Sequence, residues 1–376
     1  MTHYRRKLRN TIIKDFFLGK VIILIGARQV GKTTLMQDIF HASTIKNKKI
    51  LSFNCDDPHD RDLLAGKNSL FLKGLVNDYD IVFIDEGQKV ADIGQTVKIL
   101  VDYYKKKKQI IVTGSSSINL LDATSESLTG RKFTHILYPL SLEEIFSELD
   151  PISQRKKIEH LMIFGSYPEI VSQASFDSKE RLLRELASSA LYKDIFEFQQ
   201  VKNPQVLFSL LKALGLQIGS EYSMNELSRT CGIDVKTVER YIDLLEKNYI
   251  IFRLPPYTKN KRREITKLKK IYFYDTGIRN VIINNFNFSG ERTDMGGLWE
   301  NFIIAERMKY RAYHGISALQ YFWRTYDGAE IDLIEEQGSR VSLYECKWNA
   351  VKKRRKPPHI LRQIGRIRCI SLQKIL

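Results

Sequence analysis

Residues 26–33 contain a phosphate-binding motif that constrains the fold around it. They read Gly-Ala-Arg-Gln-Val-Gly-Lys-Thr, which matches the pattern G-x-x-x-x-G-K-[ST], and they follow the apolar run Val21–Ile25. A strand, a glycine-rich turn and a helix in this order point several backbone N–H groups at one anion. We therefore expect a purine nucleoside triphosphate here, with Lys32 at its β and γ phosphates and the Thr33 hydroxyl on Mg²⁺.

Further apolar runs alternate with helical stretches through the first 145 residues. They are Ile50–Phe53, Ile81–Ile84, Ile110–Thr113 and His135–Tyr138. Continuous apolar runs separated by helices are typical of a parallel sheet that is covered on both faces. The sequence thus predicts an α/β fold with a P-loop NTPase sheet in residues 1–145.

Two carboxylates follow the third of these five runs. Asp85 and Glu86 would lie at a strand end beside the phosphates, where Asp85 is expected to hold Mg²⁺ through water and Glu86 to polarise the attacking water. The next run ends in Thr113-Gly114-Ser115. Either Ser115 or Thr113 is a candidate sensor of the γ-phosphate, and either one could instead cap the next helix.

Arg131 precedes the last run of this region. A guanidinium here is a candidate arginine finger, acting in cis or from a neighbouring subunit, and a solvated surface arginine is the alternative. The residues expected to line the nucleotide are Gly26, Ala27, Arg28, Gln29, Val30, Gly31, Lys32, Thr33, Thr34 and Ser115.

The pattern changes twice after the P-loop region. Residues 146–217 show apolar side chains at helical spacing, which predicts a helical connector. In residues 218–270, Ser223 and Asp234 are expected to cap two short helices around a turn at 231–233. The strand at 249–254 and the loop from Pro255 to Lys270 would add a wing, so we predict a winged helix.

Residues 271–376 contain acidic residues in the order of a metal-dependent nuclease. Glu300 lies on a predicted helix, Asp332 on a strand, and Glu345 and Lys347 on the next strand. Residues two apart on a strand face the same way. Asp332, Glu345 and Glu300 are therefore candidate Mg²⁺ ligands, with Lys347 beside the reacting phosphate. A solvated strand face is the alternative, and Glu330 and Glu306 are further candidates.

The net charge of +17 favours a polyanionic partner, nucleic acid before an anionic membrane surface. The densest basic runs are 105–108, 259–263 with Lys267, Lys269 and Lys270, and 352–356. Lys236 and Arg240 share the exposed face of the second predicted helix with Glu239 and Asp243, so DNA contact and protein docking both stay open. Four scattered cysteines fit a reducing cytoplasm, and the absence of a run of about 20 apolar residues predicts no membrane insertion.

Taken together, these motifs resemble one family, the prokaryotic AAA+ superfamily ATPases that join a P-loop domain to a winged helix and a C-terminal PD-(D/E)xK nuclease-like domain. The resemblance runs over nearly the whole chain. It is carried by 26–33, Asp85-Glu86 with Gln88, 113–115, Gly130-Arg131, 139–141, 165–169, 272–277 and the series Glu300, Asp332, Glu345-Cys346-Lys347. It implies ATP and Mg²⁺ as ligands and a nuclease-like fold whose cleavage activity the motifs do not establish.

Two functions are consistent with these features. The first is an ATP-hydrolysing protein associated with DNA, whose C-terminal domain cleaves or remodels DNA. The alternative is a nucleotide-dependent signalling switch that docks proteins or associates with itself, with an inert C-terminal domain.

Overall fold

The computed structural model describes residues 4–115, 128–146, 151–189, 201, 203–258, 268–325, 328–348 and 367–371. The backbone divides into an N-terminal unit of residues 2–139 and a C-terminal unit built mainly from residues 140–246 and 250–376. Among the described helices none is both long and apolar enough to cross a bilayer.

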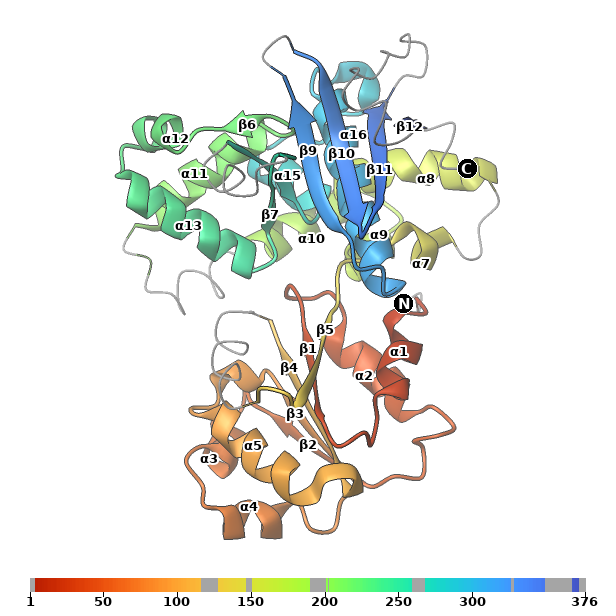
Figure 1. The fold of residues 1–376 in the computed structure, drawn as a ribbon, viewed down its shortest axis with the longest axis vertical. Helices are drawn as coiled ribbons and strands as arrows, with labels where there is room; N and C mark the ends of the chain where they lie inside the picture. The colour runs from red at the N-terminus through yellow and green to blue at the C-terminus, as the bar shows by residue number, and fades with distance from the viewer. Residues whose placement is uncertain are drawn as a thin grey trace. The chain divides into compact units, whose positions relative to one another are not determined.

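The N-terminal unit is built on a five-stranded parallel sheet, as predicted (Figure 1). Its strand order is β2-β3-β4-β1-β5, and all five strands run parallel. The strands are β1 (Val21–Ile25), β2 (Ile50–Asn54), β3 (Ile81–Asp85), β4 (Gln109–Gly114) and β5 (Lys132–Ile136). The five residues of β1 are all buried, which explains why the run carries no polar residue.

Helices cover both faces of this sheet. They are α1 (Leu8–Lys14), α2 (Lys32–Phe40), α3 (Pro58–Leu64), α4 (Ser69–Leu75) and α5 (Ile93–Tyr104), with short 3₁₀ turns η1 (Gly87–Lys89) and η2 (Lys105–Lys107). The chain moves across the sheet in one direction through α2 and in the other through α3, α4 and α5. Because parallel crossovers are right-handed, the two groups lie on opposite faces, as Figure 1 shows.

Helices also fill the first part of the C-terminal unit, where a connector was expected. They are α7 (Leu142–Phe146), α8 (Pro151–Phe164), α9 (Pro168–Val171), α10 (Phe176–Ser189) and α11 (Pro204–Leu216). A buried carboxylate ties this layer to the next segment. Asp275 accepts hydrogen bonds from the backbone N–H of Ser166 (2.7 Å) and of Gly277 (2.9 Å).

Two capped helices and a small antiparallel sheet follow. The helices are α12 (Met224–Cys231) and α13 (Val235–Lys247), and the sheet has the order β6-β8-β7, with β6 (Glu221–Tyr222), β7 (Ile251–Leu254) and β8 (Lys269–Phe273). Ser223 accepts from the N–H of Glu226, and Asp234 accepts from the N–H of Thr237 at 2.9 Å. Both caps lie where the sequence placed them. Gly232, with φ of 65°, ends α12.

A second sheet, packed against one long helix, completes the C-terminal unit. Its order is β12-β11-β10-β9, with β9 (Leu319–Arg324), β10 (Glu330–Gln337), β11 (Arg340–Lys347) and β12 (Ile367–Ser371). The remaining helical segments are α15 (Thr276–Ile282), η4 (Ser289–Glu291) and α16 (Met295–Tyr313). Leu333 and Tyr344 of the sheet pack against Ile304 of α16 in one buried cluster. This packing fixes which strand residues face the helix.

Candidate functional site

The phosphate-binding loop adopts a conformation that only glycine permits at two positions. A Cβ on Gly26 would lie 2.1 Å from the carbonyl oxygen of Leu137, and Gly31 has φ of 91°. Lys32 begins α2 and is buried, and its Nζ donates to the carbonyl oxygens of Gly26 and Ala27 at 3.0 Å each. The loop therefore holds an ammonium group beside its own backbone.

The carboxyl ends of β1, β4 and β3 bring the predicted magnesium ligands together. Thr33 Oγ1 donates to Asp85 Oδ2 at 2.8 Å, although 52 residues separate them. Thr113 Oγ1, fully buried, donates to the other oxygen of the same carboxylate. Because the Thr33 hydroxyl is the donor in this bond, its oxygen lone pairs stay available to a cation. These residues thus fit a Mg²⁺ ion bound by Thr33 and oriented by Asp85.

Glu86 is held by two side chains. Ser115 Oγ donates to Glu86 Oε2 at 3.2 Å, and Gln88 Nε2 donates to both Glu86 Oε2 (2.5 Å) and Ser115 Oγ (3.0 Å). The residue has a left-handed backbone, with φ of 53°, and this turn brings Gln88 back beside it. Ser115 thus contacts the expected catalytic carboxylate. Gln88 stood in the family motif without a role, and its position three residues beyond the end of β3 was the available signal.

The other expected nucleotide contacts lie on the loop and first helical turn. Gln29 and Thr34 are exposed, Arg28 is half-buried, and Ala27 and Val30 are buried. Gln29 has φ of 59°. The buried pair anchors the loop, while the exposed pair presents backbone and side chain to solvent.

Arg131 lies too far from this site to act on it within one chain. Its carbonyl accepts from the N–H of Val21, so it sits at the start of β1 and β5, whereas the phosphate loop follows the end of β1. Five residues of strand span about 13 Å between first and last Cα. The Arg131 guanidinium instead forms an exposed ion pair with Asp102 of α5 at 2.5 Å. The cis arginine finger is therefore wrong, and action in trans stays a prediction.

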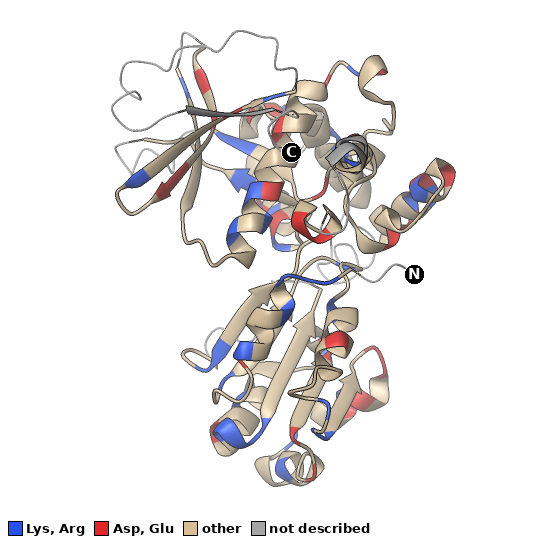
Figure 2. Ribbon diagram, turned by 90° about the vertical axis from the view of Figure 1, so that its right-hand side faces the viewer, with Lys and Arg blue, Asp and Glu red and all other residues tan. Residues whose placement is uncertain are grey.

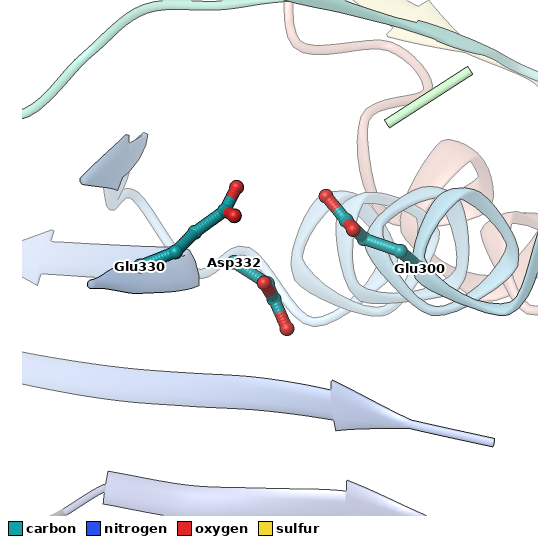
Figure 3. Close-up of side chains that lie close together, drawn as sticks. All are labelled: Glu300, Glu330 and Asp332. Carbon is teal, nitrogen blue, oxygen red and sulfur yellow. The ribbon is translucent and has the colours of Figure 1, made fainter. Parts of the chain in front are cut away.

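A second group of carboxylates gathers in the C-terminal unit (Figure 3). Glu300 of α16 faces Glu330 and Asp332 of β10, and one oxygen of each lies within 4.8 Å of the others. The pairing of β10 with β9 shifts by one residue between Ile331 and Ile334. This bulge turns Asp332 to the face of β10 that carries Leu333 and packs on α16. The backbone N–H of Cys346 donates to Asp332 Oδ2 at 2.6 Å.

A buried lysine already pairs with two of the three carboxylates in this cluster. Lys270 of β8 is fully buried, and its Nζ lies 3.0 Å from Glu300 Oε1 and also pairs with Glu330. The hydroxyl of Tyr272 donates to the same Glu300 oxygen at 2.6 Å. A divalent cation would have to displace this ammonium group and compete with the tyrosine. Glu300, Glu330 and Asp332 therefore do not fit a Mg²⁺ site.

Burial governs the ionisation of this cluster. It raises the pKa of Asp332 to about 7, with the charge of Glu300 adding to the shift, and it raises the pKa of Glu300 against the opposing charge of Lys270. Burial alone would lower the pKa of Lys270, but Glu300 and Glu330 outweigh it, so that pKa is raised. Lys270 is therefore charged at neutral pH.

Glu345 and Lys347 do not join the cluster. On β11, Tyr344 packs with Ile304 of α16, and beyond the strand Trp348 meets Trp299 of α16 with ring centroids 5.4 Å apart. Alternation places Glu345 and Lys347 on the opposite face, where they pair with each other at 2.8 Å. The predicted set of Glu300, Asp332, Glu345 and Lys347 is thus wrong as one site. The expectation that Glu345 and Lys347 share a face is confirmed.

Other charged candidates have structural partners or lie outside the described residues. Glu306 accepts from the N–H of Leu142 (2.8 Å) and pairs with Lys309 (2.7 Å). Lys270, expected among the surface lysines, is buried. The basic runs 259–263, with Lys267, and 352–356 fall in the part of the chain that the structure leaves undescribed.

The exposed face of α13 carries both signs of charge. Lys236, Glu239 and Arg240 are exposed, and Asp243 pairs with Arg253 of β7 at 2.7 Å. Because Arg253 neutralises Asp243, one of the two acidic residues on this face no longer opposes contact with DNA phosphates.

Three family models match successive parts of the chain. Residues 18–146 match an AAA domain, residues 155–289 a domain of unknown function (DUF8612), and residues 295–368 another (DUF4143). The match of residues 18–146 to an AAA domain agrees with the parallel sheet and the phosphate loop.

Relatives at low identity align over most of the chain. An uncharacterised protein of Mycobacterium tuberculosis is 26% identical over 345 residues, which is 91% of this chain and 74% of that protein. An uncharacterised protein of Haemophilus influenzae is 22% identical, over 85% of this chain and 80% of its own length.

Solved structures resemble the chain only loosely. The replication initiator DnaA bound to AMPPCP and single-stranded DNA has a TM-score of 0.35 at 17% identity, over 65% of this chain and 89% of that chain. A STAND protein from Pyrococcus horikoshii has a TM-score of 0.31 at 13% identity, over 84% of this chain and 48% of that one. Similarity this low carries no functional argument.

Proposed function

We propose that this protein binds and hydrolyses ATP at its AAA domain. The observation that carries the proposal is the meeting of Lys32, Thr33, Asp85 and Glu86 at the carboxyl ends of three adjacent strands. Lys32 would exchange its two carbonyl acceptors for phosphate oxygens. Thr33 and Asp85 would hold Mg²⁺, which supplies charge neutralisation at the phosphates.

Glu86 is the proposed general base. Gln88 and Ser115 both donate to Oε2 of its carboxylate, so the other oxygen can accept a proton from water. Ser115 is then placed to move when the γ-phosphate arrives, because its hydroxyl can bond either that phosphate or Glu86. Ser115 would in this way sense the γ-phosphate.

Glu86→Gln tests this assignment. The variant should bind ATP as the wild type does while its turnover falls by about 10²- to 10⁴-fold, the usual contribution of a general base. Lys32→Ala should lose ATP binding, since no other ammonium group lies in the loop itself. Unchanged turnover in Glu86→Gln would move the base elsewhere, and unchanged ATP affinity in Lys32→Ala would overturn the site.

We further propose that the C-terminal unit does not cleave DNA. Lys270 fills the carboxylate cluster, and Glu345 and Lys347 lie on the other face of the sheet. Supercoiled plasmid should therefore stay uncut with Mg²⁺, with or without ATP. Nicking by the wild type that disappears in Asp332→Ala would refute this proposal and indicate a nuclease site at Asp332.

DNA contact through α13 is a second candidate function. The capped pair α12 and α13, the three-stranded sheet beside them, and the exposed Lys236 and Arg240 support a winged helix that contacts phosphates. Lys236→Gln with Arg240→Gln should then weaken DNA binding. DNA affinity that is unchanged in this variant would favour the alternative, a nucleotide-dependent switch that docks proteins.

A further inference from the structure

The amino ends of the five parallel strands form an edge of the AAA domain remote from the ATP site. All five strands run in one direction, so their first residues lie together and their last residues lie together. The phosphate loop and Asp85 follow strand ends. Groups that precede the strands therefore lie at the end of the sheet opposite the phosphate loop.

Basic residues precede four of these five strands within four positions. Lys20 precedes β1, Lys46, Lys48 and Lys49 precede β2, Lys105 to Lys108 precede β4, and Arg131 precedes β5. Figure 2 shows blue segments at this end of the unit, from which the strand arrows point away. Runs far apart in the sequence thus converge into one surface, here called the basic edge.

Contacts connect these residues across the basic edge. A Cβ on Gly19 would lie 3.5 Å from Lys106 Cγ, so the Lys106 side chain passes over the chain just before Lys20. Lys108 Nζ donates to the carbonyl oxygen of Asn77 at 2.7 Å, which ties the start of β4 to the segment before β3. The lysines belong to one continuous surface.

Two of the acidic residues at this edge have basic partners, and a third, Asp78, is exposed. Asp80 pairs with Lys48 at 3.5 Å and accepts from the N–H of Lys49, and Asp102 pairs with Arg131. Lys105, Lys106 and Lys107 are exposed and form no ion pair with another described residue. The surplus charge of the edge is therefore positive and accessible.

The width of the edge suits a nucleic-acid backbone. Five strands at about 4.8 Å spacing cover about 19 Å from first to last. Duplex DNA rises about 3.4 Å per base pair, so this is the length of about five to six base pairs. Firm binding to a membrane surface would require more buried apolar area than single exposed side chains such as Leu18 offer, whereas the lysine and arginine side chains gathered here supply the charge that phosphates attract.

We propose that the basic edge binds the phosphate backbone of duplex nucleic acid without regard to base sequence. Lysine ammonium groups contact phosphates as point charges, and phosphate contacts carry no direct sequence information. This surface goes beyond the proposed ATP hydrolysis and is distinct from α13. It gives the AAA domain its own contact with nucleic acid.

The test compares two variants that lose the same charge. One is Lys105→Gln/Lys106→Gln/Lys107→Gln at the basic edge, and the other is Lys236→Gln/Arg240→Gln/Lys247→Gln, three exposed positions on α13. Fluorescence anisotropy with a labelled 20-base-pair duplex of mixed sequence is measured over a salt series. ATP binding serves as the check of folding, because the edge lies at the other end of the strands.

The edge variant should lose more than tenfold in affinity at low salt. The slope of log K against log[salt] should become shallower by about two to three, since each lost phosphate contact removes about 0.9. The α13 variant should lose less affinity than the edge variant and should keep the wild-type slope to within one contact, because α13 makes the smaller contribution.

Three outcomes would overturn the proposal. Equal losses in both variants would mean that overall charge alone drives binding. A loss confined to the α13 variant would assign the contact to that helix. Failure of the wild type to bind DNA, with edge-dependent binding to vesicles of phosphatidylserine and phosphatidylcholine, would make the partner a membrane surface.

Discussion

Replacing Lys270 by methionine removes the cation from a buried cluster of three carboxylates. Methionine has nearly the same length and lacks the charge. Glu300 and Glu330 would then lose the ammonium group that pairs with both of them, while Tyr272 would still donate to Glu300. Two acidic groups would face each other in a poorly solvated site, with Asp332 beside them.

The expected loss of stability follows from the burial of the pair. Removing one partner of a buried ion pair costs about 3–5 kcal/mol, because the other charge stays buried without compensation. Lys270 has no exposed surface and Glu300 is 13% exposed at its side chain, so solvent screens the pair little. For a unit of this size, about 2–4 °C of Tm corresponds to 1 kcal/mol, which gives a fall of about 6–20 °C.

Differential scanning calorimetry of the full chain measures this change. The loss should be larger at pH 8 than at pH 5. An acid whose folded-state pKa is raised favours the folded state while protonated, and that stability is lost as pH rises through the folded pKa. Removing Lys270 raises the carboxyl pKa values further, so the protonated state at pH 5 masks part of the damage. Glu330→Gln added to Lys270→Met should recover part of the Tm.

Lys269→Met is the matched control. It removes the same charge from the neighbouring, half-buried residue of β8 and should change the free energy of unfolding by about 0.5 kcal/mol or less. A Tm drop in Lys270→Met no larger than in this control would refute the pairing. A rise of several degrees in Tm on adding Mg²⁺ that Asp332→Asn abolishes would refute it as well, since the cluster would then be a metal site.

Three further changes test other parts of the structure. Gly26→Ala should abolish ATP binding, because its Cβ would meet the Leu137 carbonyl at 2.1 Å, and titration with a fluorescent ATP analogue would reveal any retained affinity. Gln88→Leu should lower kcat by about 10- to 100-fold at unchanged ATP affinity, since it removes a hydrogen bond to the Glu86 carboxylate, and a bond of this kind contributes about 1.5–3 kcal/mol. An unchanged kcat would leave Gln88 without a positioning role. The free energy of unfolding of the wild type should fall as pH rises from about 4 to about 7, because the pKa of Asp332 is near 4 ordinarily and about 7 in the folded state. Asp332→Asn should reduce this dependence of the unfolding free energy on pH, as measured by urea unfolding. A slope of equal size in the variant would assign the titration to another group.

The sequence predicts which residues meet at the phosphate loop, because their grouping is local. Gly26 to Thr33 are contiguous, and Asp85 and Glu86 directly follow a buried run. In a parallel sheet such strand ends meet, so proximity to Thr33 follows without knowledge of the side-chain packing. The contact of Gln88 with Glu86 depends on the left-handed backbone conformation of Glu86, which a glutamate in the sequence does not predict.

The C-terminal carboxylates were less predictable because their grouping depends on which face of each strand meets α16. Glu345 and Lys347 share a face as alternation requires, but the packing of Tyr344 turns that face away from the helix. A bulge in β10 then brings Asp332 to the helix side. A shift of one residue exchanges the two faces of a strand, and composition does not reveal it.

Lys270 also shows why a run of basic residues is a weak guide to a surface. Lys269 and Lys270 read alike in the sequence, yet one is half-buried and the other is enclosed. The difference comes from strand alternation and from acids that lie 30 and 60 residues further along the chain. Arg131 likewise follows a glycine in the order of the family motif, but it lies directly before β5, at the end of the sheet opposite the phosphate loop.

The position of Lys270 on β8 determines where the protein can be dissected. The predicted boundary between residues 270 and 271 would cut this strand and leave Glu300 and Glu330 in a fragment without their cation. Such a fragment would carry buried negative charge and expose the edge of a severed sheet, so poor solubility is expected of it whatever the expression host. Fragments for separate study should keep β8 and α16 on the same polypeptide.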